Sequence, residues 1–425
     1  MNSSGGSGEN INLYDILIKG KRLTLNERLT SFSNIYKESN DTQHNFYSRQ
    51  VISSADRQVE VIDPLTNKPK KMLMFGSNNY LGLANHPHVC EMVHKTIDRY
   101  GAGIGGPPLL NGYTSLIRKL EERLSFLKHA EDTLLFSSGY STNLGLISGL
   151  VNFNDIVFFD EYSHASFCDG IKLGKVKKST FHHNNIDELT TLLEEKSKVL
   201  RGDTFVGVEG VYSMDGDLAP LDVIVPLCRR NKATLIVDDA HGTGVMGSNG
   251  SGTSEYFGKS KEIDINMGTF SKVFAMTGGF ISASKPAINY LRFFARSYMF
   301  SASLPPVVVA AVLAGLDVIE KEPERRQMLF NNVKYAAESL RRFGFVTEPK
   351  AGIITLRVPE NMNIREAANH FHHAGIFLNA IEYPAVPVNE QRFRISMMAT
   401  HTKDDINKLI ECVEETWSKF ILHPI

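Results

Sequence analysis

Short apolar runs alternate with longer amphipathic segments between about Met72 and Ser284, and this alternation limits the folds open to the chain more than any other feature. The runs resemble β-strands: DTLLFSS (132–138), DIVFFD (155–160), TFVGVEG (204–210), TLIVDD (234–239) and GGFISAS (278–284). Segments between them, such as 115–128 and 186–200, repeat apolar residues with the period of a helix. Strands that alternate with helices predict an α/β fold with a mostly parallel sheet flanked by helices.

The pattern changes after Pro305 and predicts a second domain. Residues 306–344 have a helical pattern and include the charged run EKEPERRQ, which we expect to be a solvated helix face. Strand-like segments over 352–358, 375–381 and 392–398 follow, and then an amphipathic helix over 404–420. We therefore predict an N-terminal segment (1–68), a large domain (69–305) and a smaller α+β C-terminal domain (306–425).

Composition excludes several classes of function. The 425 residues include 46 Lys and Arg against 47 Asp and Glu, which leaves no basic excess for binding a nucleic acid backbone. Residues 1–10 lack the basic and apolar regions of a secretory signal, and are either a disordered tail or an addition to the natural chain. The most apolar stretch, 304–316, is too short to cross a bilayer. Four scattered cysteines fit a reduced compartment, so we expect a cytoplasmic protein without a membrane span.

Two groups of residues near predicted strand ends could do chemistry, although each has an ordinary structural explanation. Lys272 stands among the hydroxyl residues Thr269 and Ser271, but most lysines are simply solvated. Asp238 ends an apolar strand, where a carboxylate needs a cationic partner or a protonated ligand. His241 follows in the glycine-rich HGTG sequence, which allows close approach of the backbone.

Two further elements lie earlier in the chain. SSGYSTN (137–143) follows a strand and opens a helix, so its backbone N–H groups could bind an anion such as phosphate. His164 follows the strand that ends at Asp160, and a lone histidine there is more often a packed core residue. Together, a phosphate cradle, a ring-stacking histidine, an acid and a lysine match the requirements of pyridoxal phosphate (PLP).

Longer segments resemble one enzyme family over most of the chain. They are NFYSRQ (45–50), FGSNNYLGL (75–83), SSGYSTN, DEYSHAS (160–166), HHNN (182–185), EGVYSMDGDLAPL (209–221), VDDAHGTGVMG (237–247), GTFSK (268–272), MFSASLPP (299–306) and RISMMATHT (394–402). On these motifs the chain resembles the α-oxoamine synthases, which are PLP-dependent acyltransferases of fold type I. The resemblance implies a large PLP-binding domain and a smaller C-terminal domain.

The resemblance also implies roles for individual residues. Lys272 would form a Schiff base with PLP, Asp238 would pair with the ring nitrogen, His241 would contact the ring hydroxyl, and His164 would stack on the ring. The other implied cofactor contacts are Ser138, Gly139, Tyr140, Ser213, Thr269, Ser271 and Ser301, the last reaching the phosphate of the neighbouring subunit. Asn78 and Arg394 would bind the amino acid substrate. The implied assembly is a homodimer with shared active sites.

The implied reaction joins a small amino acid to an acyl thioester and releases CO₂ and a free thiol. LMFGSNNYLGL, RSYMFSAS and MMATHTKDDI are most similar to soluble bacterial serine palmitoyltransferases, which favours serine, a long acyl chain and a 3-ketosphinganine-like product of sphingolipid biosynthesis. HGTG is more like the enzymes that make 8-amino-7-oxononanoate or 2-amino-3-ketobutyrate, which favours alanine or glycine. The donor is acyl-CoA or an acyl carrier protein, and a long acyl group would bring the enzyme to a membrane surface.

One segment departs from the family pattern. The usual Gly-Ser-Arg is Gly106-Pro107-Pro108, the usual Thr is Tyr113, and the usual His is Ile117. If the segment borders the acyl entry, the changes favour a more apolar or carrier-bound acyl group. The alternative is sequence drift, without functional meaning, at a dimer surface.

Three other roles fit the sequence less well. A non-catalytic partner subunit would lack the lysine that stands here at 272, and a transaminase would not need a thioester. The histidine pairs 182–183 and 372–373 lack further residues at ligand spacing, so we expect no metal site.

Overall fold

The computed structural model describes residues 18, 20–41, 47–196 and 202–422. These residues form two compact units, which we describe separately. Unit 2 is Asn78–Met328, and unit 1 combines the chain up to Ser77 with the chain from Leu329 onward. The three-part division at residues 68 and 305 stays a prediction.

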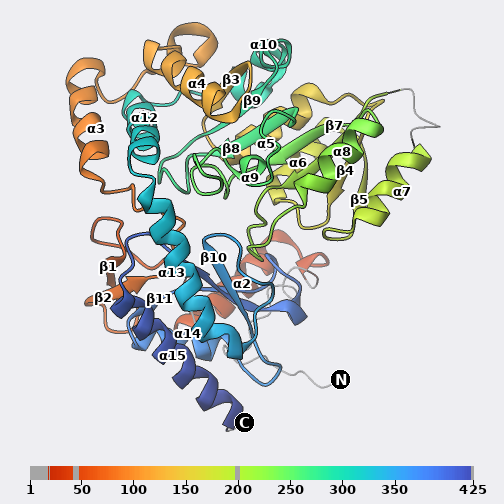
Figure 1. Ribbon diagram of the computed structural model, residues 1–425. Helices are drawn as coiled ribbons and strands as arrows, with labels where there is room; N and C mark the ends of the chain where they lie inside the picture. Colours follow the sequence, from red (N-terminus) through yellow and green to blue (C-terminus); the bar gives the residue numbers. More distant parts are fainter. Residues whose placement is uncertain (1–17, 19, 42–46, 197–201, 423–425) are drawn as a thin grey trace. The chain divides into compact units, whose positions relative to one another are not determined.

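Unit 2 is built on a seven-stranded sheet with the order β3-β9-β8-β7-β6-β4-β5 (Figure 1). The strands are β3 (Asp132–Phe136), β4 (Ile156–Asp160), β5 (Lys177–Phe181), β6 (Thr204–Glu209), β7 (Thr234–Asp238), β8 (Ile265–Thr269) and β9 (Gly279–Ala283). Only β9 runs antiparallel to its neighbours, β3 and β8. The predicted α/β fold with a mostly parallel sheet is confirmed.

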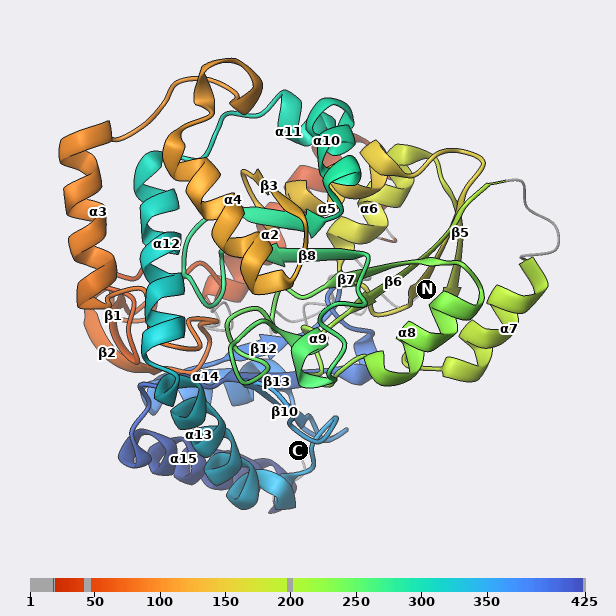
Figure 2. The same cartoon turned by 45° about the horizontal axis from the view of Figure 1, so that its top comes forward.

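Helices cover both faces of this sheet, which explains its near-continuous apolar strands. Successive side chains of a strand point to opposite faces. Phe159 therefore packs in a cluster with residues of α5 (Gly139–Leu150), α6 (Ala165–Gly174) and α10 (Lys285–Phe294), whereas Phe158 packs with residues of α7 (Ile186–Lys196) and α8 (Leu221–Arg230). Figure 2 shows helices on both faces of the sheet. The helices of unit 2 are α3 (Pro87–Tyr100), α4 (Ser115–Lys128), α5 (Gly139–Leu150), α6 (Ala165–Gly174), α7 (Ile186–Lys196), α8 (Leu221–Arg230), α9 (Thr253–Tyr256), α10 (Lys285–Phe294), α11 (Arg296–Met299) and α12 (Pro306–Lys321).

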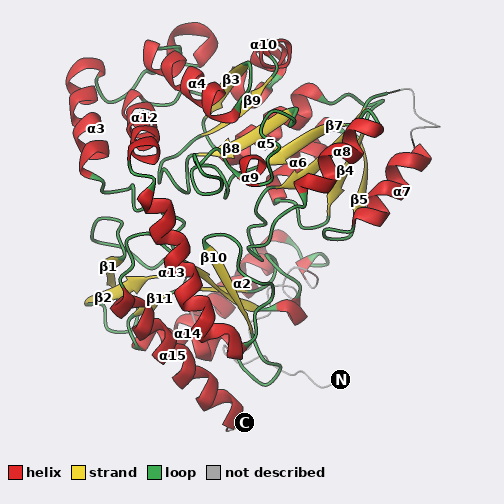
Figure 3. Cartoon of the chain, in the orientation of Figure 1, coloured by secondary structure: helices red, strands yellow, loops and turns green. Residues whose placement is uncertain are grey.

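Unit 1 contains two three-stranded sheets and several helices (Figure 3). One sheet pairs β1 (Gln58–Ile62) with β2 (Pro69–Met74), and β2 with β11 (Ile376–Phe377). The other sheet has the order β10 (Ile353–Arg357), β13 (Arg392–Ser396) and β12 (Asn379–Ile381). The helices of this unit are α2 (Leu25–Asp41), α14 (Ile364–His373) and α15 (Lys403–Leu422), with most of α13 (Glu324–Leu340).

The helical region after Pro305 is two helices, because Pro323 cannot continue the first one. Its charged run does not lie entirely in solvent. Arg326 is buried and donates hydrogen bonds to the carbonyl oxygens of Ile319 (2.7 Å) and Ser248 (2.6 Å). The expectation of a solvated face is therefore wrong at this residue, whose guanidinium satisfies carbonyl groups that the sequence pattern does not reveal.

Within the described part of the chain, no helix has the length and apolar character needed to cross a membrane. The same residues contain no group of three or more His, Cys, Asp or Glu side chains placed to hold a metal ion.

Candidate active site

Polar residues gather at one edge of the large sheet, where its parallel strands end. β4, β6, β7 and β8 end at Asp160, Glu209, Asp238 and Thr269. Ligands of open α/β sheets bind beyond the carboxyl ends of the strands. The loops that leave this edge carry most of the residues predicted to bind PLP, and all of these residues belong to unit 2.

The predicted phosphate loop opens helix α5 directly after strand β3. Ser138 caps the helix, because its hydroxyl accepts a hydrogen bond from the amide of Ser141 (3.0 Å). Gly139 lies against Thr269, and a Cβ added at Gly139 would come within 2.7 Å of the Thr269 hydroxyl. Only glycine therefore lets the start of the helix approach Thr269 this closely, and amide N–H groups at a helix start are suited to an anion.

Asp238 is tied to His164 by two intervening side chains. The side-chain nitrogen of Asn143, Nδ2, donates to the Asp238 carboxylate (2.8 Å) and to the hydroxyl of Ser166 (2.9 Å). That hydroxyl lies 2.7 Å from His164 Nδ1, and His164 is an exposed residue. The network orients the Asp238 carboxylate and links it to His164. Asn143 was not predicted individually, although it ends the SSGYSTN motif.

Glu209 is a second buried carboxyl group at this edge, and it was not predicted. It is paired with Asp238 in the register of β6 and β7. Burial and then the charge of Asp238 raise the pKa of Glu209 well above its usual range, while Lys272 acts in the opposite direction. Burial beside Asp238 thus disfavours the ionised form of Glu209.

His241 is held by an aromatic hydroxyl from a distant part of the chain. The Tyr80 hydroxyl lies 2.7 Å from His241 Nδ1 and also donates to the Asn78 side chain at 3.3 Å. His241 is buried, and its ring orientation is fixed by this contact. Tyr80 lies in the FGSNNYLGL motif, but its pairing with His241 was not predicted.

A fully buried ion pair anchors the loop that carries His241. Lys128 Nζ lies 2.7 Å from the carboxylate of Asp239, the residue after Asp238, and both side chains are at most 1% exposed. Lys128 also donates to the Ser251 carbonyl (2.5 Å), and the Thr253 hydroxyl donates to Asp239 (2.7 Å). The loop from β7 to α9 is thereby closed onto the end of α4.

Replacing Lys128 with methionine is expected to lower the free energy of unfolding by about 3–5 kcal/mol, because Asp239 would remain buried without its cation. Urea unfolding of the apoprotein, followed by circular dichroism, measures this change. Lys95→Met is the matched control, because the Lys95–Glu91 pair (2.6 Å) is exposed and its loss should not be measurable. Equal unfolding midpoints for the two variants would contradict this account of the ion pair.

The lysine loop follows β8. The Thr269 hydroxyl donates to the carbonyl of Gly278 (3.0 Å) and lies 3.0 Å from the hydroxyl of Ser271. These contacts close the turn that carries Lys272, which is partly buried. Thr269 thus touches both the lysine loop and the phosphate loop, and brings the two predicted elements together.

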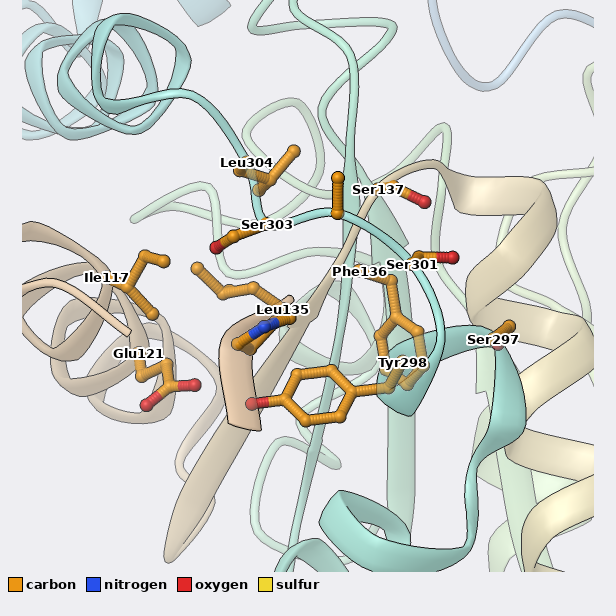
Figure 4. A pocket seen from close by; sticks show the side chains of 12 residues that line it. Ile117, Glu121, Leu135, Phe136, Ser137, Ser297, Tyr298, Ser301, Ser303 and Leu304 are labelled. Carbon is orange, nitrogen blue, oxygen red and sulfur yellow. The ribbon is translucent and has the colours of Figure 1, made fainter. Parts of the chain in front are cut away.

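Ser301 lines a small cavity of its own chain (Figure 4). The wall includes Ser137 next to the phosphate loop, as well as Pro108, Ile117 and Glu121. The role of Ser301 at the phosphate of a neighbouring subunit stays a prediction.

The departures from the family pattern meet around Glu121. Ile117 is buried, Pro108 lines the same cavity, and the Tyr113 hydroxyl donates to the Glu121 carboxylate at 2.5 Å. Burial raises the pKa of Glu121 to about 7. The substituted residues therefore pack together around one buried carboxyl group.

Ser213 lies on the loop after β6 and Tyr140 in the first turn of α5, both in unit 2, whereas Arg394 belongs to the other unit. The Ser213 amide donates to Glu209 (3.2 Å), and the Tyr140 hydroxyl donates to Asp169. Arg394 belongs to unit 1, where it is buried on β13 and donates to the Ser396 hydroxyl (2.8 Å). Its role as a ligand of the substrate carboxylate stays a prediction.

The residues of unit 2 fit PLP. Gly139 leaves room for close approach at a helix start, and Asp238 offers a buried carboxylate. Two buried oxygens at this edge, Asn143 Oδ1 and Glu209 Oε1, accept no hydrogen bond from the residues that the structure describes. Polar groups of this kind are what a polar ligand would satisfy.

Comparison with known proteins identifies the family. Residues 70–413 match the family model for aminotransferase class I and II. The chain is 39% identical to the 8-amino-7-oxononanoate synthase of Lysinibacillus sphaericus, over 81% of this chain and 89% of the relative. It is 38% identical to the serine palmitoyltransferase of Sphingobacterium spiritivorum, over 92% and 96% of the two chains.

Solved structures agree with this assignment. Serine palmitoyltransferase of Sphingomonas wittichii superposes with a TM-score of 0.87 at 28% identity, and covers 95% of this chain and 100% of its own. A variant of the S. paucimobilis enzyme holding PLP joined to myriocin has a TM-score of 0.88 at 27% identity, over 94% and 100% of the two chains. The cofactor of this chain is PLP, and the chain belongs to the α-oxoamine synthase family of PLP-dependent C-acyltransferases.

Proposed function

We propose that this enzyme joins serine to a long-chain acyl thioester and releases CO₂ and a free thiol. The observation that carries the proposal is the match over 398 residues to the serine palmitoyltransferase of Sphingobacterium spiritivorum, which spans nearly the full length of both chains. The motifs LMFGSNNYLGL, RSYMFSAS and MMATHTKDDI support the same substrate pair. The product would be a 3-ketosphinganine-like α-oxoamine of sphingolipid biosynthesis.

PLP, when bound, supplies an aldehyde that joins an amine and a protonated ring that withdraws electrons from the α-carbon of the substrate. Lys272 supplies the amine that holds the cofactor, and after release it accepts the α-proton of the amino acid. Asp238 keeps a proton at the ring nitrogen, with its carboxylate oriented by Asn143. His164 would stack on the ring.

Other residues bind the phosphate and ring hydroxyl of the cofactor and the carboxylate of the amino acid. The amides of Ser138, Gly139 and Tyr140 hold the phosphate. Thr269 and Ser271 add hydroxyl contacts around the cofactor. His241, oriented by Tyr80, contacts the ring hydroxyl. Arg394 grips the carboxylate of the amino acid with its planar fork. Asn78 and Ser213 lie beside the amino acid, and Ser213 also contacts the cofactor.

The bond changes balance without any further reactant. The α-carbon of the amino acid bonds to the acyl carbon of the thioester, and the thiolate leaves and takes up a proton. The carboxyl group then departs as CO₂, and a proton replaces it on the α-carbon. We propose that this occurs in a cytoplasmic homodimer, in which Ser301 reaches the phosphate of the neighbouring subunit.

The apolar residues Pro108 and Ile117 support a long acyl group, on the proposal that this segment borders the acyl entry. Both residues line the same cavity, where the family pattern has an arginine and a histidine. Loss of these two polar groups favours an apolar substrate chain. This part of the proposal fails if short acyl-CoAs are the best substrates.

The test uses the holoenzyme and two readouts. Serine, alanine and glycine are titrated against the visible absorption band of the cofactor, and thiol release is then followed with acyl-CoAs of increasing length. We expect serine to shift the band at the lowest concentration, and long acyl-CoAs to give the highest kcat/KM. Tighter binding of alanine together with a preference for short acyl groups would favour the second candidate, a reaction like that of 8-amino-7-oxononanoate synthase. The Lysinibacillus sphaericus relative supports that candidate.

A further inference from the structure

His183 lies between two loops that carry predicted cofactor residues. Its Nδ1 lies 3.0 Å from the carboxylate of Asp160, and its Nε2 lies 2.8 Å from the carboxylate of Asp217. Asp160 ends β4, and Asp217 lies in the loop after β6, two adjacent strands of the sheet. A single imidazole ring therefore bridges the ends of neighbouring strands.

The Asp160 side of the bridge supports the turn that leads to His164. Asp160 is fully buried, and its carboxylate accepts the amides of Tyr162 (2.9 Å) and Asn184 (2.8 Å). The backbone carbonyl of Asp160 accepts the amide of Ser163 (3.0 Å). His164 is the next residue and caps α6. The position of His164 thus depends on how Asp160 is held.

The Asp217 side supports the loop that carries Ser213. The Tyr212 amide donates to the Asp217 carbonyl (3.0 Å), and the Gly216 amide donates to the Tyr212 carbonyl (2.8 Å), which closes the loop around Ser213. The side chain of Asn184 adds hydrogen bonds to the Asp217 carboxylate (2.9 Å) and to the Leu218 carbonyl (3.2 Å). His183 and Asn184 thus hold this loop together.

The ring of His183 is also fixed by aromatic contacts. It stacks on Tyr162 with a centroid distance of 4.4 Å and an interplanar angle of 18°, and meets the buried Tyr212 edge-on at 4.5 Å and 87°. Burial alone would lower the pKa of His183, but hydrogen bonds to Asp160 and Asp217 raise it to about 10. The ring is therefore an imidazolium near neutral pH, with one donor for each carboxylate.

We infer that His183 is a positioning residue, which joins the turn 160–164 to the loop 212–218 so that His164 and Ser213 meet the cofactor together. The inference rests on the cofactor contacts in the proposed function, but not on the identity of either substrate. Neutral side chains cannot replace the ring fully, because two carboxylates need two charge-assisted donors in opposite directions.

The test compares His183→Gln with His182→Gln. His182 is the matched control, because it is the adjacent histidine, is exposed, and bonds to Glu188 at the surface (2.7 Å). Titration of each apoprotein with PLP gives the dissociation constant, and visible circular dichroism of the bound cofactor reports its orientation. We expect His183→Gln to weaken PLP binding about tenfold or more and to reduce the dichroic band, since hydrogen bonds to charged groups contribute that much. His182→Gln should match the unchanged protein in both measurements.

A third variant covers the outcome in which His183→Gln fails to fold. Asp217→Asn removes the charge of the less buried carboxylate, and leaves the contact between His183 and Asp160 in place. We expect a smaller change in the same direction, about twofold to tenfold in PLP affinity, with a weaker dichroic band. The inference is overturned if folded His183→Gln, or Asp217→Asn when the former does not fold, binds PLP with unchanged affinity and dichroism. Substrate preference enters none of these readouts, so a wrong substrate assignment would leave them unaffected.

Discussion

Replacement of Lys272 with alanine is expected to remove the visible absorption band of the bound cofactor and to lower turnover by about 10³-fold or more. The turn that carries Lys272 is closed by the hydroxyl of Thr269, which bonds to the Gly278 carbonyl and lies against the phosphate loop. No other lysine is placed on that turn. No second amine there can therefore attach the cofactor or accept the α-proton in place of Lys272. Absorption spectra after gel filtration and an assay of thiol release measure both losses.

Lys285→Ala is the control for this experiment. Lys285 is exposed at the start of α10, directly after β9. Because β9 runs antiparallel to β8, Lys285 follows the edge of the sheet opposite to Lys272. Its loss should leave the spectrum and turnover unchanged. A normal band in purified Lys272→Ala, with normal thiol release, would refute the assignment of Lys272.

Asp238→Asn should retain PLP poorly and lose turnover by a factor of about 10²–10⁴. The substitution keeps the size of the side chain and can still accept the hydrogen bond from Asn143. A neutral amide cannot stabilise a proton on the ring nitrogen, and burial, which raises the pKa of the neighbouring Glu209, disfavours a replacement charge there. PLP titration and steady-state kinetics give the two effects separately.

Asp264→Asn is the matched control. Asp264 directly precedes β8, at the amino edge of the sheet, where it accepts the amide of Leu235 (2.8 Å). The same chemical change at that edge should leave PLP affinity unchanged. Normal turnover by Asp238→Asn would show that Asp238 does not hold the ring nitrogen.

The fold was predictable where strands are buried on both faces. β4 and β9 are buried along their whole length, and each lies within the predicted run. β5 was not predicted, because it is an edge strand with the sequence KKSTF and exposed lysines. β1 and β2 carry charged residues, and β2 pairs with β11 from about 300 residues later, a contact that no local pattern reveals.

The candidate site was predictable through motifs, but not through its internal contacts. The loops of Gly139, Asp238 and Lys272 lie at the strand edge where the strand pattern placed them. The partners that orient these residues come from distant segments. Tyr80 is 161 residues from His241, and Lys128 is 111 residues from Asp239. Such pairings depend on the three-dimensional packing of the elements, which periodicity and spacing do not encode.

The substrate pair and the chemistry are tested together by one measurement. Holoenzyme is incubated with serine labelled in its carboxyl carbon and a long-chain acyl-CoA, and labelled CO₂ and free thiol are measured in the same sample. The account predicts equal amounts of the two products, and neither product when serine or the acyl-CoA is omitted. Thiol release without CO₂, or formation of a keto acid from serine with the thioester intact, would contradict it.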